Sequence, residues 1–123
     1  VVGANFRYGT QSPFLGIAGD EKGETVAIGL DANLKQRWRY LLPAGGHQRP
    51  IEPVASGELL AGRAGTWVIA GPDGSIHFLS EDGELTDSFF YGACITGIAV
   101  CKIDEAPALL VATDEGVTAW RVQ

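Results

Sequence analysis

The sequence predicts an all-β fold built from about three four-stranded antiparallel sheets. Glycine makes up 17 of the 123 residues, about twice its usual share, and the glycines separate short apolar runs. Those runs alternate apolar and polar residues between Gly, Asp and Pro turns, as half-buried strands do. No segment of about ten or more residues carries apolar side chains at helical spacing, so we expect no helix.

One strand-turn-strand plan occurs three times along the chain. In each copy an apolar strand ends in Ala-Gly or Ala-Thr, an acidic turn closed by glycine follows, and a second strand begins. The copies occupy Phe14–Trp38, Thr66–Phe90 and Leu109–Val122, with Gly23, Gly74 and Gly116 at equivalent positions. These glycines recur at intervals of about 40 to 50 residues, the repeat length of β-propellers, in which each blade is a four-stranded sheet.

The segments between the hairpins supply the remaining strands. Outer strands are expected within Lys35–Leu42 and Glu84–Gly92, and inner strands within Ile51–Gly62 and Ile95–Asp104. The chain therefore divides into units of roughly residues 1–42, 43–92 and 93–123. The third unit has no fourth strand of its own, and we expect Val1–Tyr8 to supply one, within the chain or across to a partner.

The stretch LDANLKQRWRY, Leu30–Tyr40, resembles the signature of the quinoprotein-like (pyrroloquinoline-quinone-type) repeat of β-propellers. The resemblance extends from about Phe14 to Val122. It departs from the family where Asn33-Leu34-Lys35 replaces the usual Thr-Gly-Lys, and where Phe89 takes the place of Trp38 in the second unit. The resemblance implies that Trp38 packs between neighbouring blades. We expect Trp38, Phe89 and Trp120 to be structural.

Three units make a partial ring, because closed propellers have about four to eight blades. The open sides of such a partial ring are association-prone edges. We therefore expect a protein partner, or self-association, to complete the propeller. The resemblance implies a periplasmic or extracellular location.

Charge and apolar content exclude two classes of partner. The formal net charge is −6, so the average surface repels nucleic acid. No apolar stretch approaches the ~18 residues of a membrane span. Cys94 and Cys101 lie on one expected strand, too far apart along it to form a disulfide with each other.

The best candidate binding surface is one face of the propeller, formed by turns between second and third strands and by linkers between units. Side chains that can bind a ligand gather there: His47, Gln48, Arg49, Asp73, Tyr91 and Asp114. Loops on a rigid scaffold commonly carry function. The alternative is that the Asp-Gly and Glu-Gly pairs only satisfy turn geometry.

The motifs of catalysis and of metal binding are missing from the sequence. The two histidines, His47 and His77, belong to no zinc-binding pattern, and no serine lies in a nucleophile elbow. We expect no metal and no cofactor, since cofactor-binding members of the family gather residues from a complete ring. The sequence thus predicts a non-catalytic scaffold that binds a protein or other ligand through loops on one face. The alternative is a fragment of a quinoprotein dehydrogenase or a carbohydrate-active propeller enzyme.

Overall fold

The computed structural model describes residues 2–3, 13–19, 24–43, 54–59 and 65–121, which form β-strands and no helix. The strands pair into three antiparallel sheets, which we call sheets A, B and C. Sheet A contains β1 (Val2–Gly3), β2 (Phe14–Gly19), β3 (Thr25–Leu30) and β4 (Gln36–Leu41). Sheet B contains β5 (Val54–Gly57), β6 (Thr66–Ala70), β7 (Ser75–Ser80) and β8 (Leu85–Phe90). Sheet C contains β9 (Ile95–Ile103), β10 (Ala106–Thr113) and β11 (Gly116–Arg121).

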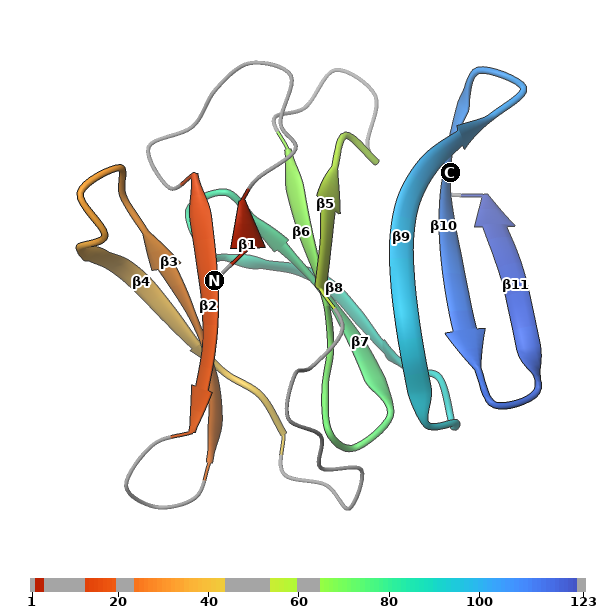
Figure 1. Cartoon of the computed structure of the whole chain (residues 1–123), viewed down its shortest axis with the longest axis horizontal. Helices are drawn as coiled ribbons and strands as arrows, with labels where there is room; N and C mark the ends of the chain where they lie inside the picture. Colours follow the sequence, from red (N-terminus) through yellow and green to blue (C-terminus); the bar gives the residue numbers. More distant parts are fainter. Residues whose placement is uncertain (1, 4–12, 20–23, 44–53, 60–64, 122–123) are drawn as a thin grey trace.

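Each sheet is an up-and-down meander in which every strand pairs with its neighbour in sequence. The sheets stand side by side in chain order, with sheet B between the other two (Figure 1). Consecutive meanders packed in this way are the blades of a β-propeller, so the predicted fold class is confirmed. Among the residues that the structure describes, sheets A and B have four strands each and sheet C has three. The division of the chain into units at residues 42/43 and 92/93 stays a prediction.

The first strand corrects one expectation. Val2 pairs with Leu15 and Gly3 with Phe14, so β1 is the first strand of sheet A. The expectation that residues 1–8 complete the third unit is therefore wrong for the two residues that the structure describes. Pairing with β2 closes a much shorter loop than pairing with sheet C, and a shorter loop loses less conformational entropy.

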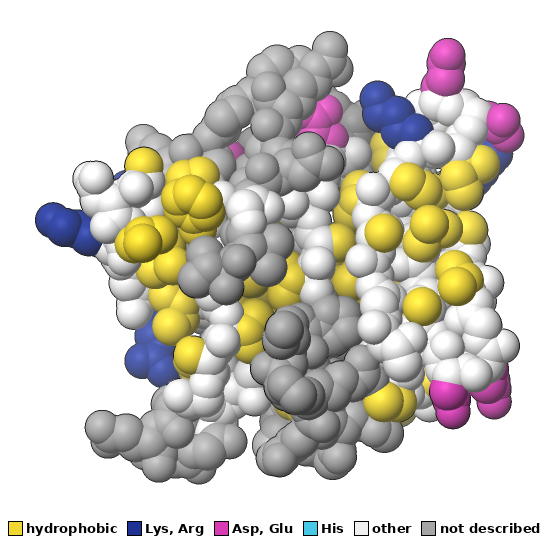
Figure 2. Space-filling model, viewed as in Figure 1, with side chains coloured by type: hydrophobic (Ala, Val, Ile, Leu, Met, Phe, Trp, Pro, Cys, Tyr) yellow, Lys and Arg dark blue, Asp and Glu magenta, His cyan; other side chains and the backbone are white. Residues whose placement is uncertain are grey.

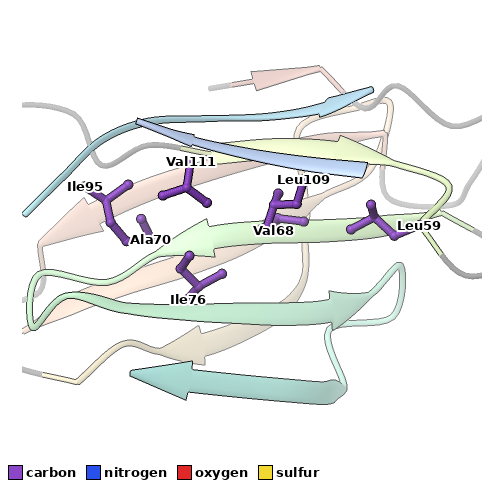
Figure 3. Packing of buried hydrophobic residues seen from close by; sticks show 7 residues of the cluster. All are labelled: Leu59, Val68, Ala70, Ile76, Ile95, Leu109 and Val111. Carbon is purple, nitrogen blue, oxygen red and sulfur yellow. The ribbon is translucent and has the colours of Figure 1, made fainter. Parts of the chain in front are cut away.

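Sheet B is packed on both faces, which explains why all five residues of β6 are buried. Toward sheet A, Trp67, Ile69 and Leu79 pack with Leu15 and Ala27. The opposite face carries a second cluster, formed by Leu59, Val68, Ala70, Ile76, Ile95, Leu109 and Val111 (Figure 3). Because full burial of one such large apolar side chain stabilises a fold by roughly 1.5–3 kcal/mol, these two clusters hold the sheets together.

Trp38 joins sheet A to sheet B. Its indole Nε1–H donates to the carbonyl oxygen of Glu81, in the β7–β8 turn, at 3.0 Å. The ring lies between two glycines, one on its own sheet and one on the next. A Cβ built on Gly29 would lie 2.1 Å from the indole, and one on Gly83 would lie 2.4 Å from it. The expected packing of Trp38 between neighbouring blades is thus confirmed.

The counterpart of Trp38 in sheet B is Asp87 rather than Phe89. The two outer hairpins share their turn hydrogen bonds, Asp31 N–H to Lys35 O and Ser80 N–H to Glu84 O. Both also have a register shift directly before the turn, at Gly29/Leu30 and at Phe78/Leu79. Trp38 pairs with Gly29 directly before the shift, and Asp87 pairs with Phe78 at the same place in sheet B. The expectation that Phe89 takes the place of Trp38 in the second unit is therefore wrong by two positions.

Cys94 and Cys101 are both free and half-buried, which confirms that they do not form a disulfide with each other. Within the described ranges there is no helix able to cross a membrane. Nor does any group of three or more His, Cys, Asp and Glu side chains in those ranges lie in an arrangement that could hold a metal ion.

Candidate functional site

The turns expected on one face lie at one end of the sheets. The β6–β7 turn, the β10–β11 turn and the β8–β9 connection are all at the lower end in Figure 1. They carry Asp73, Asp114 and Tyr91, respectively. The other three predicted binding residues, His47, Gln48 and Arg49, lie outside the described residues. That any of the six binds a ligand stays a prediction.

Asp73 has a structural role in its turn. Its Oδ1 accepts a hydrogen bond from the backbone N–H of Ser75 at 3.1 Å, and the Ser75 hydroxyl also donates to Oδ1. Such side-chain bonds to the backbone two residues further on stabilise turns. The alternative interpretation, that the Asp-Gly pair serves turn geometry, therefore accounts for Asp73.

The same hydroxyl belongs to a buried polar chain that links sheets A and B. Ser75 Oγ lies 2.6 Å from His77 Nε2, and His77 Nδ1 lies 3.0 Å from the Tyr40 hydroxyl on β4. Because the Asp73 carboxylate only accepts, Ser75 donates to it and must accept from an Nε2–H of His77. The chain therefore places a proton on Nε2, and in the neutral imidazole Nδ1 accepts from the Tyr40 hydroxyl.

Burial shifts the acid–base properties of this chain. Desolvation lowers the pKa of His77, and the negative charge of Asp73 opposes that shift. Desolvation also raises the pKa of Tyr40, and the Asp73 charge adds to that effect. Both shifts favour the neutral forms of His77 and Tyr40, in which the Tyr40 hydroxyl donates to Nδ1.

A serine beside a histidine is also the arrangement of a nucleophile and its base. Here Ser75 and His77 are only 7% and 4% exposed, and Gly71 lies over them. The hydroxyl proton is engaged by Asp73, so the pair serves as an inter-sheet connection. Sequence reasoning missed it, although Ser75 and His77 sit two residues apart and hence on one face of a strand.

Tyr91 lies in a row of aromatic rings that runs from sheet B to sheet C. Its backbone N–H donates to Gly74 O at 2.9 Å, which fixes the residue after β8 to the β6–β7 turn. The ring is edge-on to Trp120, with centroids 6.3 Å apart, and the Trp120 Nε1–H donates to the Tyr91 hydroxyl at 3.4 Å. Phe89 and Phe78 continue the row, with centroids 5.8 Å apart.

These rings line a cleft of about 920 Å³ between the outer parts of sheets B and C, which we call the B–C cleft. Five of its fourteen lining residues are aromatic, and two of these are well exposed, Phe90 at 72% and Trp120 at 50%. The charged side chains in it are Asp87, Glu115 and Arg121. The full lining is Phe78, Asp87, Phe89, Phe90, Tyr91, Ala93, Leu109, Thr113, Glu115, Gly116, Val117, Thr118, Trp120 and Arg121.

The cleft brings Tyr91 together with residues that the sequence analysis treated as structural. Phe89 and Trp120, which we expected to be structural, are 40% and 50% exposed and line the cleft. Asp114 lies beside the lining residue Glu115, whereas Asp73 is not part of the lining. Figure 2 shows hydrophobic side chains spread over sheet C, with acidic side chains at both of its ends.

The fold and the cleft define a repeat protein of blade-like antiparallel sheets. No family model matches the sequence, and no curated protein matches it either. Among solved structures, the chain is similar to the crystal structure of BamB from Moraxella catarrhalis, with 16% sequence identity and a TM-score of 0.47. The match covers 87% of this chain and 28% of that one, so the chain spans less than a third of its length.

Proposed function

We propose that this chain is a non-catalytic β-propeller scaffold that binds a protein partner at the end of sheets B and C. The observation that carries the proposal is the B–C cleft. It is open, it is large enough for several side chains, and it exposes aromatic rings, those of Phe90 and Trp120 among them. Monomeric proteins rarely expose such a patch without a use, and aromatic residues are enriched in protein interfaces.

The cleft joins the loop surface predicted from the sequence. Tyr91 lies in both, and Asp114 adjoins Glu115 at the rim. A bound partner would therefore contact a rigid aromatic centre and a polar, acidic edge, the usual anatomy of a binding surface. A protein partner, or a second copy that completes the propeller, is the class of ligand that fits a surface of this kind.

The non-catalytic part of the proposal rests on the pair that comes nearest to catalytic chemistry. The Ser75 hydroxyl is buried, donates to Asp73 and accepts from His77, so it is not presented to a substrate. The alternative, a fragment of a quinoprotein dehydrogenase or carbohydrate-active enzyme, has no supporting observation among the described residues.

Selection of peptides on the intact chain tests the proposal. A random peptide library displayed on phage is panned against the immobilised protein, and the affinity of enriched peptides is measured by fluorescence anisotropy. Binding should weaken about tenfold or more in Phe90→Ser, which removes an exposed ring of the cleft. Leu41→Ser is the matched control, since Leu41 is 53% exposed on sheet A. Absence of enriched peptides, or equal weakening by both substitutions, would contradict the proposal.

A further inference from the structure

The buried polar chain joins sheets A and B through a side chain that can titrate. His77 on β7 is 4% exposed, and its Nδ1 lies 3.0 Å from the Tyr40 hydroxyl on β4. The two rings are also in contact, with centroids 5.5 Å apart. The other members of the chain, Ser75 and Asp73, belong to sheet B and its β6–β7 turn. The bond between His77 and Tyr40 is therefore the part of the chain that connects the two sheets.

Protonation of Nδ1 reverses this bond. In the neutral imidazole Nδ1 accepts from the Tyr40 hydroxyl, whereas both ring nitrogens of an imidazolium donate. The Tyr40 oxygen would then have to accept, and its own proton would need a new acceptor. Among the described residues, the Tyr40 hydroxyl bonds to His77 and to no other group. Because a partly buried hydroxyl that loses its acceptor costs free energy, the protonated state favours a Tyr40 hydroxyl that reaches water.

The bonds within sheet B tolerate the same proton. The Nε2–H of His77 still donates to Ser75 Oγ, and the Ser75 hydroxyl still donates to the Asp73 carboxylate. An imidazolium is thus linked through one hydroxyl to a negative charge, which offsets part of the cost of burying it. Protonation therefore keeps the bonds within sheet B and changes the bond between the sheets.

Two titratable groups face His77 among the described residues, Tyr40 from β4 and Asp73 from the β6–β7 turn. The charged side chains Arg39 and Asp87 lie on the opposite faces of β4 and β8, because they alternate with Tyr40 and with the residue beside His77. The uncharged neighbours are Ile69 on β6, Ser88 on β8 and Ala27, which pairs with Tyr40, on β3. Burial lowers the pKa of His77 from 6.5 and the Asp73 charge opposes that shift, so the ring is neutral at pH 7 and takes up its proton on acidification.

A second contact between the outer strands contains no titratable group. Trp38 lies two residues before Tyr40, on the same face of β4, and its Nε1–H donates to Glu81 O at 3.0 Å. This bond does not change with pH, because it joins an indole to a backbone carbonyl. Acid would thus release β4 at Tyr40 while Trp38 still holds it to sheet B.

We propose that His77 is a pH-sensitive contact between sheets A and B. Protonation of its Nδ1 releases Tyr40 and admits water to the interface between the two sheets, while the strands of both sheets stay formed. The inference concerns the interior of the fold and does not rest on the proposed function.

The accessibility of tryptophan at this interface tests the proposal. In a Trp120→Phe chain the two remaining tryptophans, Trp38 and Trp67, both pack between sheets A and B. Acrylamide quenching of their fluorescence is measured from pH 7.5 to pH 4, with circular dichroism to follow the strands and histidine NMR to give the pKa of His77. We expect quenching to increase as the pH falls, with its midpoint at the pKa of His77, while the circular dichroism stays constant.

Three results would overturn the proposal. Quenching could stay constant while His77 titrates, His77 could stay neutral down to pH 4, or the circular dichroism could be lost at the same pH as the quenching rises. The last result would mean that the chain unfolds as a whole.

Substitutions in the Trp120→Phe chain connect the response to the hydrogen bond. His77→Gln keeps a neutral side chain that can donate to Ser75 and accept from Tyr40, so quenching should become independent of pH. Tyr40→Phe removes the hydroxyl that stabilises the neutral imidazole, so the midpoint should rise by about 0.5 to 1 on the pH scale. Tyr91→Phe removes a phenol hydroxyl in the B–C cleft and should leave the midpoint unchanged. A response that survives in His77→Gln, or equal shifts in the two tyrosine variants, would assign the response to another group and overturn the proposal.

Discussion

The effect of Gly29→Ala on the free energy of unfolding should change sign when Trp38 is replaced by alanine, and a double-mutant cycle measures this. A Cβ on Gly29 would lie 2.1 Å from the indole carbon, a separation that no packed structure accommodates, so Gly29→Ala must displace the ring. Removal of a fully buried Trp costs about 3–5 kcal/mol, and Trp38 is half-buried, so we expect Gly29→Ala to destabilise the chain by about 2–3 kcal/mol. Trp38→Ala should cost a similar amount.

When Trp38 is already replaced by alanine, Gly29→Ala should stabilise the chain. Without the indole the added methyl meets no clash, and alanine is favoured over glycine in a strand interior by roughly 0.5–1 kcal/mol. Gly29→Ala would then be stabilising by about 0.5 kcal/mol, and the coupling free energy would be about 2.5–3.5 kcal/mol.

Urea unfolding followed by far-ultraviolet circular dichroism measures all four chains, and tryptophan fluorescence provides a second probe. Coincident transitions establish that the free energies of unfolding are comparable. The reasoning is refuted if the two substitutions add without coupling, because the indole then does not lie over Gly29.

Three further predictions follow from the same structure. The pKa of His77 in the folded chain is lowered from 6.5, so the unfolded chain binds the proton more readily. The contribution of His77 to the free energy of unfolding should therefore be complete above about pH 6.5 and fall as the pH drops toward the pKa of the folded state. Urea titrations between pH 5 and 7.5 should show this slope in the unsubstituted chain, and His77→Gln should remove it. Leu34 has a φ of 63° at the position where Gly83 stands in the next hairpin, so Leu34→Gly should raise the free energy of unfolding by about 0.5–1 kcal/mol; a loss of stability would contradict this. A Cβ on Gly57 would lie 2.6 Å from Val100 Cγ1, so Gly57→Ala should lower the melting temperature, and Val100→Ala should restore part of the loss if β5 and β9 pack as described.

The strands of this fold follow from local sequence, because each unit repeats one alternation of apolar residues and one type of turn. The hairpin of β6 and β7 is an example, since Pro-Asp-Gly separates two apolar runs that form paired antiparallel strands. Packing between blades was also predictable at Trp38, where the resemblance to a repeat family supplied the role of the residue.

Register and pairing over longer distances were not predictable in the same way. Counting from the turn glycines Gly23 and Gly74, which are 51 residues apart, matches Phe89 to Trp38. The equivalent turn residues Asp31 and Ser80 are only 49 residues apart, so the counterpart of Trp38 is Asp87. The two-residue strand β1 has too few residues to show a pattern. The cleft depends on the rings of Phe89, Tyr91 and Trp120, which come together only in three dimensions.

Whether peptides bind in the B–C cleft is the most informative measurement, made by titrating enriched library peptides into the intact chain and following fluorescence anisotropy. Phe90→Ser should weaken binding about tenfold or more, because Phe90 is 72% exposed in the cleft. Leu41→Ser, at an exposed position on sheet A, should leave the affinity unchanged. Equal affinities of the two variants would show that the cleft is not the binding surface.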